Sequence, residues 1–250
     1  MKAIVMAAGK GTRLQEPGNP CPKVLRKANN KTLLEYVLNT MPMIDKKDIT
    51  IVTGFMSEAV EEYFKDSGCN FQRQGDDAYG TGYAVMCGMK NSDFDDYHGD
   101  ILIVNGDAPL TKLSTIEGII KMHQDEKNCA TLLSSSTELK LPYGRIIRTD
   151  DGKNVVNIIE EKDCTEEQKK IKELNIGVYV FNADALREGL KMINSNNAAG
   201  EYYLTDVPPA IARLGKKVNA FITTCDDELW GVNTPDDLLA VEKILKSREK

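Results

Sequence analysis

The part of the chain that most restricts its fold is the segment 4–13, IVMAAGKGTR. Its apolar run is too short for a helix and breaks into a glycine-rich turn, which predicts a first β-strand followed by a tight turn. Gly9 and Gly11 lack the Cβ atoms that keep backbone N–H groups away from a ligand, and consecutive N–H groups in such a turn form a concave anion site. Arg13 adds a forked donor for phosphate oxygens. The segment therefore predicts a phosphate cradle at the end of the first strand.

The glycine spacing alone does not identify a nucleotide class. It lacks the G-x-x-x-x-G-K order of a P-loop. It also lacks the third glycine of the dinucleotide fingerprint G-x-G-x-x-G, because Leu14 stands at that position. A tight strand-to-helix turn without a ligand is the alternative interpretation.

Short β-branched runs alternate with helical patterns through the first half of the chain. The predicted strands cover 49–53, 70–74 and 101–104, and the predicted helices cover 32–41, 57–64 and 81–89. This alternation predicts an α/β fold, a Rossmann-like and mostly parallel sheet flanked by helices on both faces. Ligands of such sheets bind off the carboxyl ends of the strands. The cradle and Asp107, which follows strand 101–104, should therefore face one crevice.

The second half is less regular. We predict strands at 131–135, 144–148, 154–160 and 176–181, a short helix with a Thr165–Gln168 capping box, and helix starts at 205–209 and 234–237. The last of these helices should run to near Ser247. No repeat or low-complexity linker divides the sequence, so we expect one domain over 1–250, with a nucleotide-binding half at 1–110 and a substrate-side half at 111–250.

Composition excludes several classes of protein. The chain has 250 residues, of which 41% are hydrophobic, and its 32 Lys and Arg against 38 Asp and Glu give a net charge of −6 without a long basic run. Nucleic acid is therefore not an expected partner, and no apolar run approaches the roughly 20 residues that span a membrane. The six cysteines show no C-x-x-C pair, which is typical of reduced thiols. We expect a soluble, cytoplasmic protein.

Several short motifs occur in a fixed order along the chain: AAGKGTR at 7–13, PKVL at 22–25, GTG at 80–82, GDAPL at 106–110, YGR at 143–145, EEKD at 160–163, NIG at 175–177, GEYYLTD at 200–206 and GVN at 231–233. With these motifs the chain resembles the sugar-1-phosphate nucleotidyltransferases. More narrowly, it resembles the uridyltransferase domain of the bacterial bifunctional enzymes that make UDP-N-acetylglucosamine. The resemblance covers nearly all of the sequence.

The resemblance implies that a sugar 1-phosphate oxygen attacks the α-phosphorus of UTP in line and that Mg-pyrophosphate leaves. Such transfers depend mainly on positioning and on charge neutralisation. Arg13 would hold the β- and γ-phosphates, and Lys23 would neutralise charge at the α-phosphate. Asp107 and Asn233 would ligate Mg²⁺, which prefers oxygen donors. The backbone around the nucleotide would come from Met6, Ala7, Ala8, Gly9 and Gly11.

For the base, the resemblance implies Gln74, whose amide can pair with an imide edge, together with the backbone of Gly80 and Thr81. For the sugar side, it implies Asn105, Gly106, Gly144, Glu160 and Asn175.

Several of these residues also have a purely structural interpretation. Lys23 could be an ordinary loop lysine, Arg13 could pair with a surface acid, and Asp107 could close a turn. Asn233 could lead into the Thr234 cap, and Glu160 could belong to a solvated charge run.

Four departures from the family pattern lie on the substrate side. The loop between Arg13 and Pro22 is a few residues longer than expected and rich in proline, and an additional residue separates Gln74 from Gly80. Asn105 replaces the tyrosine usual before Gly-Asp, and Trp230 precedes Gly231. These changes leave the identity of the sugar open, but not the reaction class. The alternative enzymes have the same fold and act on another hexose 1-phosphate, or on CTP with an alcohol phosphate.

A non-catalytic sensor of nucleotide-sugars is an alternative from another class of protein. The sequence contains no hexapeptide repeats of the acetyltransferase domain, so we expect no acetyl transfer if it is the full gene product. The sequence does not fix the oligomeric state.

Overall fold

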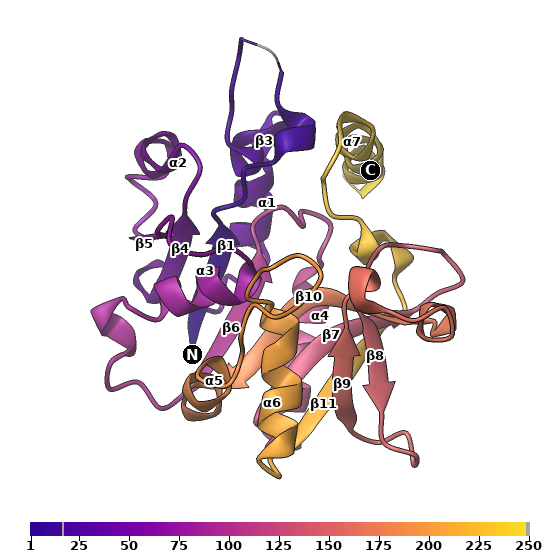
Figure 1. Cartoon of the computed structure of the whole chain (residues 1–250). Coiled ribbons are helices and arrows are strands. Elements are labelled where there is room, and N and C mark those ends of the chain that lie inside the picture. The colour runs from indigo at the N-terminus through magenta and orange to yellow at the C-terminus, as the bar shows by residue number, and fades with distance from the viewer. Residues whose placement is uncertain (17, 249–250) are drawn as a thin grey trace.

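The computed structural model describes residues 1–16 and 18–248, and Pro17 of the proline-rich loop lies outside the described residues. Within them, a nine-stranded sheet has the order β11-β7-β10-β6-β1-β4-β5, with β8 paired to β10 and β9 paired to β8 (Figure 1). Its strands are β1 (Lys2–Ala7), β4 (Ile49–Thr53), β5 (Asn70–Arg73), β6 (Asp100–Asn105), β7 (Ala130–Ser136), β8 (Arg145–Arg148), β9 (Val155–Ile159), β10 (Glu173–Asn182) and β11 (Val218–Thr223). A second, two-stranded sheet pairs β2 (Lys27–Ala28) with β3 (Lys31–Thr32).

The α-helices of the described chain connect these strands. They are α1 (Leu33–Asn39), α2 (Ser57–Tyr63), α3 (Thr81–Gly88), α4 (Leu113–Asp125), α5 (Ala183–Leu190), α6 (Val207–Arg213) and α7 (Pro235–Arg248). Local chemistry fixes some of their starts. At α1 the Thr32 hydroxyl accepts from the Glu35 amide at 3.1 Å, while the Glu35 carboxylate accepts from the Thr32 amide at 2.6 Å. This reciprocal capping box satisfies two amides that have no partner within the helix.

The predicted α/β fold is confirmed. β1 pairs in parallel with β4 and β6, and β4 pairs in parallel with β5. β10 runs antiparallel between β6 and β7, and β11 joins the far edge in parallel with β7. The sheet is therefore mixed but mostly parallel, and the carboxyl ends of β1, β4, β5 and β6 lie at one edge.

Alternation along the strands distributes the apolar side chains to two faces. On β1, Ala3 and Val5 pack in the cluster that includes α1, α2 and α4, whereas Ile4 packs in the cluster that includes α3, α5 and α6. A third cluster joins α7 to Leu14 and Leu33 above the carboxyl edge. Figure 1 shows α7 beside the β3 hairpin at this edge. No helix in the described ranges combines the length and apolar character needed to cross a membrane.

Other elements differ from the sequence predictions. α4, α5 and β11 were not predicted. The Thr165–Gln168 capping box forms, with both hydrogen bonds present, but it precedes only a 3₁₀ turn at Gln168–Lys170. α6 begins with prolines at its first turn as expected, but the Thr205 hydroxyl donates to Glu160 instead of capping the helix.

Candidate active site

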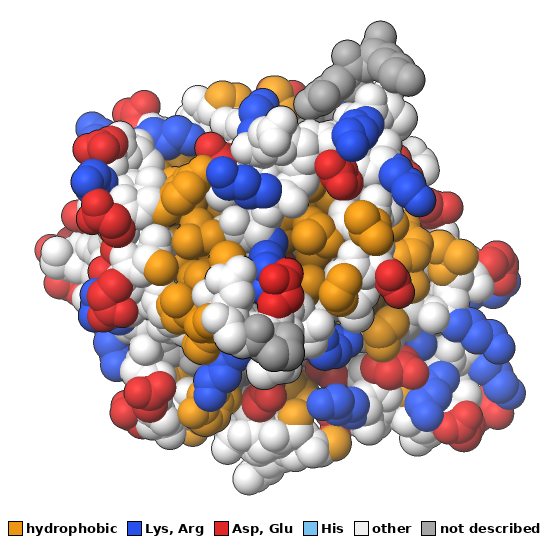
Figure 2. All heavy atoms as spheres, turned by 90° about the horizontal axis from the view of Figure 1, so that it is seen from above, with side chains coloured by type: hydrophobic (Ala, Val, Ile, Leu, Met, Phe, Trp, Pro, Cys, Tyr) orange, Lys and Arg blue, Asp and Glu red, His pale blue; other side chains and the backbone are white. Residues whose placement is uncertain are grey.

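A cavity of about 740 Å³ opens at the carboxyl edge of the parallel strands. We call it the nucleotide lobe. Figure 2 looks down on this face, where hydrophobic side chains gather around the centre and charged ones lie mostly around the rim. A smaller cavity of about 230 Å³, the acceptor lobe, shares lining residues with it. The shared residues are Met6, Thr81, Asn105, Asp107 and Asn233.

The glycine-rich turn forms one wall of the nucleotide lobe. Gly9 faces open space, since no atom lies within 4 Å of where its Cβ would be. Gly11 has φ +55°, and a Cβ there would lie 2.8 Å from the Cβ of Lys23. Only glycine combines this left-handed backbone with such close packing. Arg13 follows in a 3₁₀ turn, exposed at the lobe, and forms no ion pair with any described residue.

Lys23, Asp107 and Asn233 meet where the two lobes join. Lys23 is buried, its ammonium forms an ion pair with the Asp107 carboxylate, and it donates to the Asn233 Oδ1 at 2.9 Å. Asp107 follows β6, and its carbonyl accepts from the Val232 amide at 3.1 Å. Asp237 in the first turn of α7 accepts from the Asn233 amide at 2.9 Å. The start of α7 thus holds Asn233 opposite Asp107.

This pair of oxygens fits a hard divalent cation. The Asp107 carboxylate and the Asn233 Oδ1 both contact the Lys23 ammonium group, which occupies a position where a metal cation could bind instead. No group of three or more His, Cys, Asp or Glu side chains is arranged to hold a metal in residues 1–16 and 18–248. A site with two protein oxygens is typical of Mg²⁺, which keeps several waters and binds substrate phosphates.

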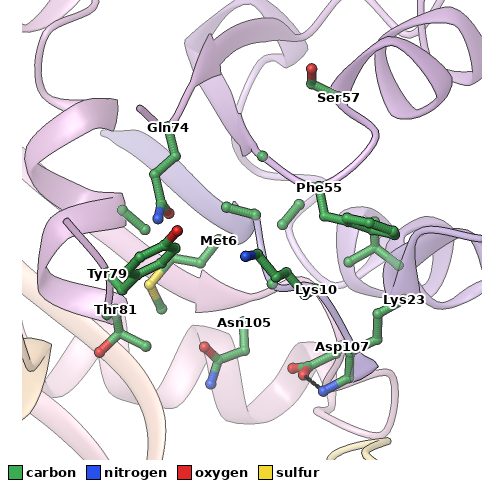
Figure 3. A pocket seen from close by; sticks show the side chains of 18 of the residues that line it. Met6, Lys10, Lys23, Phe55, Ser57, Gln74, Tyr79, Thr81, Asn105 and Asp107 are labelled. Carbon is green, nitrogen blue, oxygen red and sulfur yellow. Dashed lines mark ion pairs between the residues drawn. The ribbon is translucent and has the colours of Figure 1, made fainter. Parts of the chain in front are cut away.

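The candidate base-binding residues lie together on the other side of the nucleotide lobe (Figure 3). Gln74 follows β5, and its backbone N–H donates to the Thr53 carbonyl at 2.7 Å. Gly80 has φ +113°, and a Cβ there would collide with the Tyr202 carbonyl. The Thr81 hydroxyl accepts from the Leu204 amide at 3.0 Å. Segment 202–204 therefore fixes the turn that carries Gly80 and Thr81.

The acceptor lobe contains Gly144, Glu160 and Asn175. The Asn175 Nδ2 donates to the Tyr179 hydroxyl at 2.7 Å, while its buried Oδ1 has no partner among the described residues. The Thr205 hydroxyl donates to the Glu160 carboxylate at 2.7 Å. Burial raises the pKa of Glu160 despite this hydrogen bond, and nearby carboxylates raise it further.

Asn105 and Gly106 were both predicted for the sugar side, but only Asn105 lines a cavity. Asn105 lines both lobes, and its amide lies against Gly177, where any Cβ would collide with it. Gly106 lines neither lobe. Its backbone N–H donates to the Met6 carbonyl at 2.9 Å, so Gly106 extends the pairing of β6 with β1 by one residue.

Sequence reasoning missed some lining residues, among them Lys10, Phe55, Tyr79 and Glu201 in the nucleotide lobe and Tyr143 and Tyr179 in the acceptor lobe. Lys10 stands between the two cradle glycines and could have been found from that position. Phe55 comes close only because its amide donates to the Ala8 carbonyl at 3.2 Å, a contact between distant segments that no local pattern indicates.

A glycine-rich turn, two cationic side chains and a carboxylate–amide pair at the edge of a parallel sheet are groups suited to an enzyme that transfers nucleotidyl groups. A family model described as the MobA-like NTP transferase domain matches residues 3–171. The chain belongs to this family and is a nucleotidyltransferase, so the reaction class expected from the motifs is confirmed.

Curated relatives agree with the narrower resemblance. The bifunctional protein GlmU of Clostridium perfringens (strain SM101 / Type A) is 39% identical over 247 residues, which cover 98% of this chain and 52% of the relative. GlmU of Clostridium beijerinckii is also 39% identical, over 246 residues with the same coverage. The chain thus spans about half the length of the curated relatives it matches.

A solved structure of a UDP-glucose pyrophosphorylase complexed with UDP-glucose superposes with a TM-score of 0.74, covering 99% of this chain and 98% of that chain. At 18% identity, this likeness establishes the fold alone.

Proposed function

We propose that the chain transfers a uridylyl group from UTP to N-acetylglucosamine 1-phosphate, or to a closely related hexosamine or hexose 1-phosphate, and releases pyrophosphate. The observation that carries this proposal is the junction of the two lobes. A nucleotide-sized cavity with a glycine cradle meets a smaller cavity with Glu160 and Asn175, and Lys23 and Asp107 lie between them. Residues 1–110 would provide most of the nucleotide site, and 111–250 most of the acceptor site.

In this reaction an oxygen of the acceptor phosphate forms a bond to the α-phosphorus as the bond from that phosphorus to the α–β bridging oxygen breaks. Pyrophosphate leaves with the electron pair. The cradle amides and Arg13 would hold the β- and γ-phosphates, and Lys23 would neutralise charge at the α-phosphate. Asp107 and Asn233 would hold Mg²⁺, whose chemistry when bound is to neutralise phosphate charge as a Lewis acid.

The acceptor lobe has groups that suit a sugar. The Oδ1 of Asn175 is buried without a described partner, and leaving a buried acceptor unpaired is costly. A sugar hydroxyl would supply the missing donor. Glu160 could accept from a second hydroxyl beside the Thr205 contact.

The test is pyrophosphate release with each of the four nucleoside triphosphates and a panel of sugar 1-phosphates and alditol phosphates. UTP with a hexosamine 1-phosphate should give the highest turnover. UTP giving no more turnover than CTP would contradict the uridylyl assignment and favour a cytidylyl enzyme. Full turnover in Asp107→Ala with Mg²⁺ present would show that the metal assignment is wrong.

A further inference from the structure

The side chains of Lys10 and Tyr79 meet across the nucleotide lobe, and the proposed reaction gives neither of them a role. The Lys10 Nζ lies 5.1 Å from the centroid of the Tyr79 ring, and Figure 3 shows the lysine pointing towards the ring from the cradle side. Tyr79 is 47% exposed. Among the described residues its hydroxyl has no hydrogen-bond partner, and Lys10 has no ion pair.

The backbone of both residues is held in place. The Gln15 side chain donates to the Lys10 carbonyl at 2.9 Å. The Tyr202 backbone N–H donates to the Tyr79 carbonyl at 2.9 Å, and Gly80, the next residue after Tyr79, packs against the Tyr202 backbone. An aromatic side chain that is exposed on a fixed backbone and points into a cavity is suited to bind a ligand there, since little of its position remains to be ordered.

The face of the Tyr79 ring is available to the lobe. A cation near the centroid contacts the π face of a ring, so Lys10 shows that this face points into the cavity. Gln74, the candidate for reading the base edge, lines the same lobe. Proteins commonly hold an unpaired base by stacking it on an aromatic ring while polar groups bond its edge.

We propose that Tyr79 is the stacking platform for the nucleobase of the bound nucleotide and that Lys10 exchanges the ring for the nucleotide phosphates. The first part follows from the ring face that Lys10 contacts, which is directed into the lobe that Gln74 also lines. The second follows from the position of Lys10 between Gly9 and Gly11, since a phosphate attracts an ammonium group more strongly than an aromatic ring does. The inference rests on the proposed nucleotide site but not on the identity of the base.

Binding of UMP, UDP and UTP to the full chain, measured by calorimetry at fixed Mg²⁺ and salt, separates the two parts. Tyr79→Leu should weaken all three nucleotides by about the same factor, on the order of tenfold, because each carries the same base. Tyr79→Phe retains a ring and should recover most of the affinity. Lys10→Met should weaken UTP more than UMP, since its partner is the phosphate chain.

The chain provides a matched pair of controls. Tyr63 is 46% exposed, and the Lys27 Nζ lies 6.0 Å from its ring centroid. Neither residue lines either lobe. Tyr63→Leu and Lys27→Met make the same chemical changes at a similar contact, and we expect both to leave the affinities unchanged.

Unchanged affinity in Tyr79→Leu, or equal losses in Tyr79→Leu and Tyr79→Phe, would overturn the platform. Equal weakening of UMP and UTP by Lys10→Met would overturn the exchange. The same titrations with ATP, CTP and GTP distinguish a failure of the stacking platform from a failure of the uridylyl proposal. If the protein prefers one of these, the uridylyl proposal fails, while a loss of that nucleotide in Tyr79→Leu supports the platform. A protein that binds no nucleotide would overturn both.

Discussion

Lys23 and Asp107 form an ion pair in which the lysine ammonium lies between the two oxygens assigned to the metal, those of Asp107 and Asn233. The same cation therefore neutralises the carboxylate of the proposed metal site and is itself one of the proposed catalytic residues. A metal bound by Asp107 and Asn233 requires Lys23 to move, and the place where its charge is then needed is the nucleotide phosphate. Metal binding and the engagement of Lys23 with substrate are thus linked.

Lys23→Met tests this link. We expect turnover to fall by about 10³-fold, the range for losing a preorganised charge in a phosphoryl or acyl transfer site. We also expect tighter binding of Mg²⁺ or Mn²⁺ without nucleotide, because the competing cation is removed. Calorimetry with the metal alone measures the second effect, with Lys27→Met as the control. Metal affinity that is unchanged or weaker than in the wild type would contradict a shared position for the two cations.

The two cradle glycines should respond differently to the same methyl group. Gly9 faces open space, so Gly9→Ala should leave stability within about 0.5 kcal/mol but raise KM for the nucleotide about tenfold, equal to ~1.4 kcal/mol. Gly11→Ala combines a left-handed backbone with a Cβ 2.8 Å from that of Lys23. We expect it to destabilise the fold by about 1–3 kcal/mol and also to lower turnover.

Gly152→Ala is the control for backbone strain, since Gly152 has φ +71° but no atom within 4 Å of its Cβ position. Denaturant unfolding together with steady-state kinetics measures all three variants. Gly152→Ala should lose some stability and no activity. A Gly9→Ala protein that is destabilised yet binds nucleotide normally would be inconsistent with an open cradle.

Gln15 is expected to position the loop between Arg13 and Lys23. Its Nε2 donates to the carbonyls of Lys10 and Cys21, both at 2.9 Å, and its Oε1 accepts from the Cys21 amide at 3.0 Å. Gln15→Ala should lower kcat about tenfold and speed hydrogen exchange in residues 10–16 and 18–21, because a typical hydrogen bond contributes ~1 kcal/mol. Gln15→Glu keeps the acceptor but places a carboxylate against two carbonyls, so it should not restore kcat. Normal kcat and exchange in Gln15→Glu would rule out this role.

Two parts of the candidate site, the glycine-rich cradle and Asp107, could be predicted from local patterns, whereas Lys23, Gln74 and Asn233 were expected only from the family resemblance. The cradle directly follows the first strand, and Asp107 follows the most apolar strand. In a parallel sheet such positions meet at one edge. The contacts that the sequence did not reveal join distant segments, such as Lys23 against Gly11 and Tyr202 against Gly80.

The strand at 176–181 was predicted, but its direction was not. β10 lies antiparallel between two strands that are far from it in sequence, and strand direction is not encoded in local alternation. By contrast, α4 has buried Thr115, Ile116, Ile119 and His123 at helical spacing, so its pattern was present in the sequence and could have been recognised.

Glu160 gives a prediction about pH. Burial raises its pKa, opposed by the Thr205 hydrogen bond and reinforced by the carboxylates of Asp206, Asp163 and Glu201. The folded protein therefore holds this proton more strongly than the unfolded chain does. Its contribution to stability is greatest below the ordinary glutamate pKa and is lost as the pH rises through the folded pKa.

Glu160→Gln removes the free-energy cost of burying a charged carboxylate at neutral pH, while the amide oxygen of the glutamine can still accept from Thr205. The variant should have a higher Tm than the wild type at pH 7.5, and the difference should shrink towards pH 4. Its KM for the acceptor should rise about tenfold, since a hydrogen bond to a charged group becomes one to a neutral group. Scanning calorimetry across this range measures the first effect. A Tm difference independent of pH would mean that Glu160 is not the group whose ionisation opposes folding.

The most direct test of the whole account is a crystal structure of the protein with UDP-N-acetylglucosamine and Mg²⁺. We expect the diphosphate against the backbone of Gly9 and Gly11, the metal bonded to oxygens of Asp107 and Asn233, and the Lys23 ammonium moved onto a phosphate oxygen. A nucleotide bound away from the glycine turn, or a metal that contacts neither Asp107 nor Asn233, would contradict the site and the reaction proposed from it.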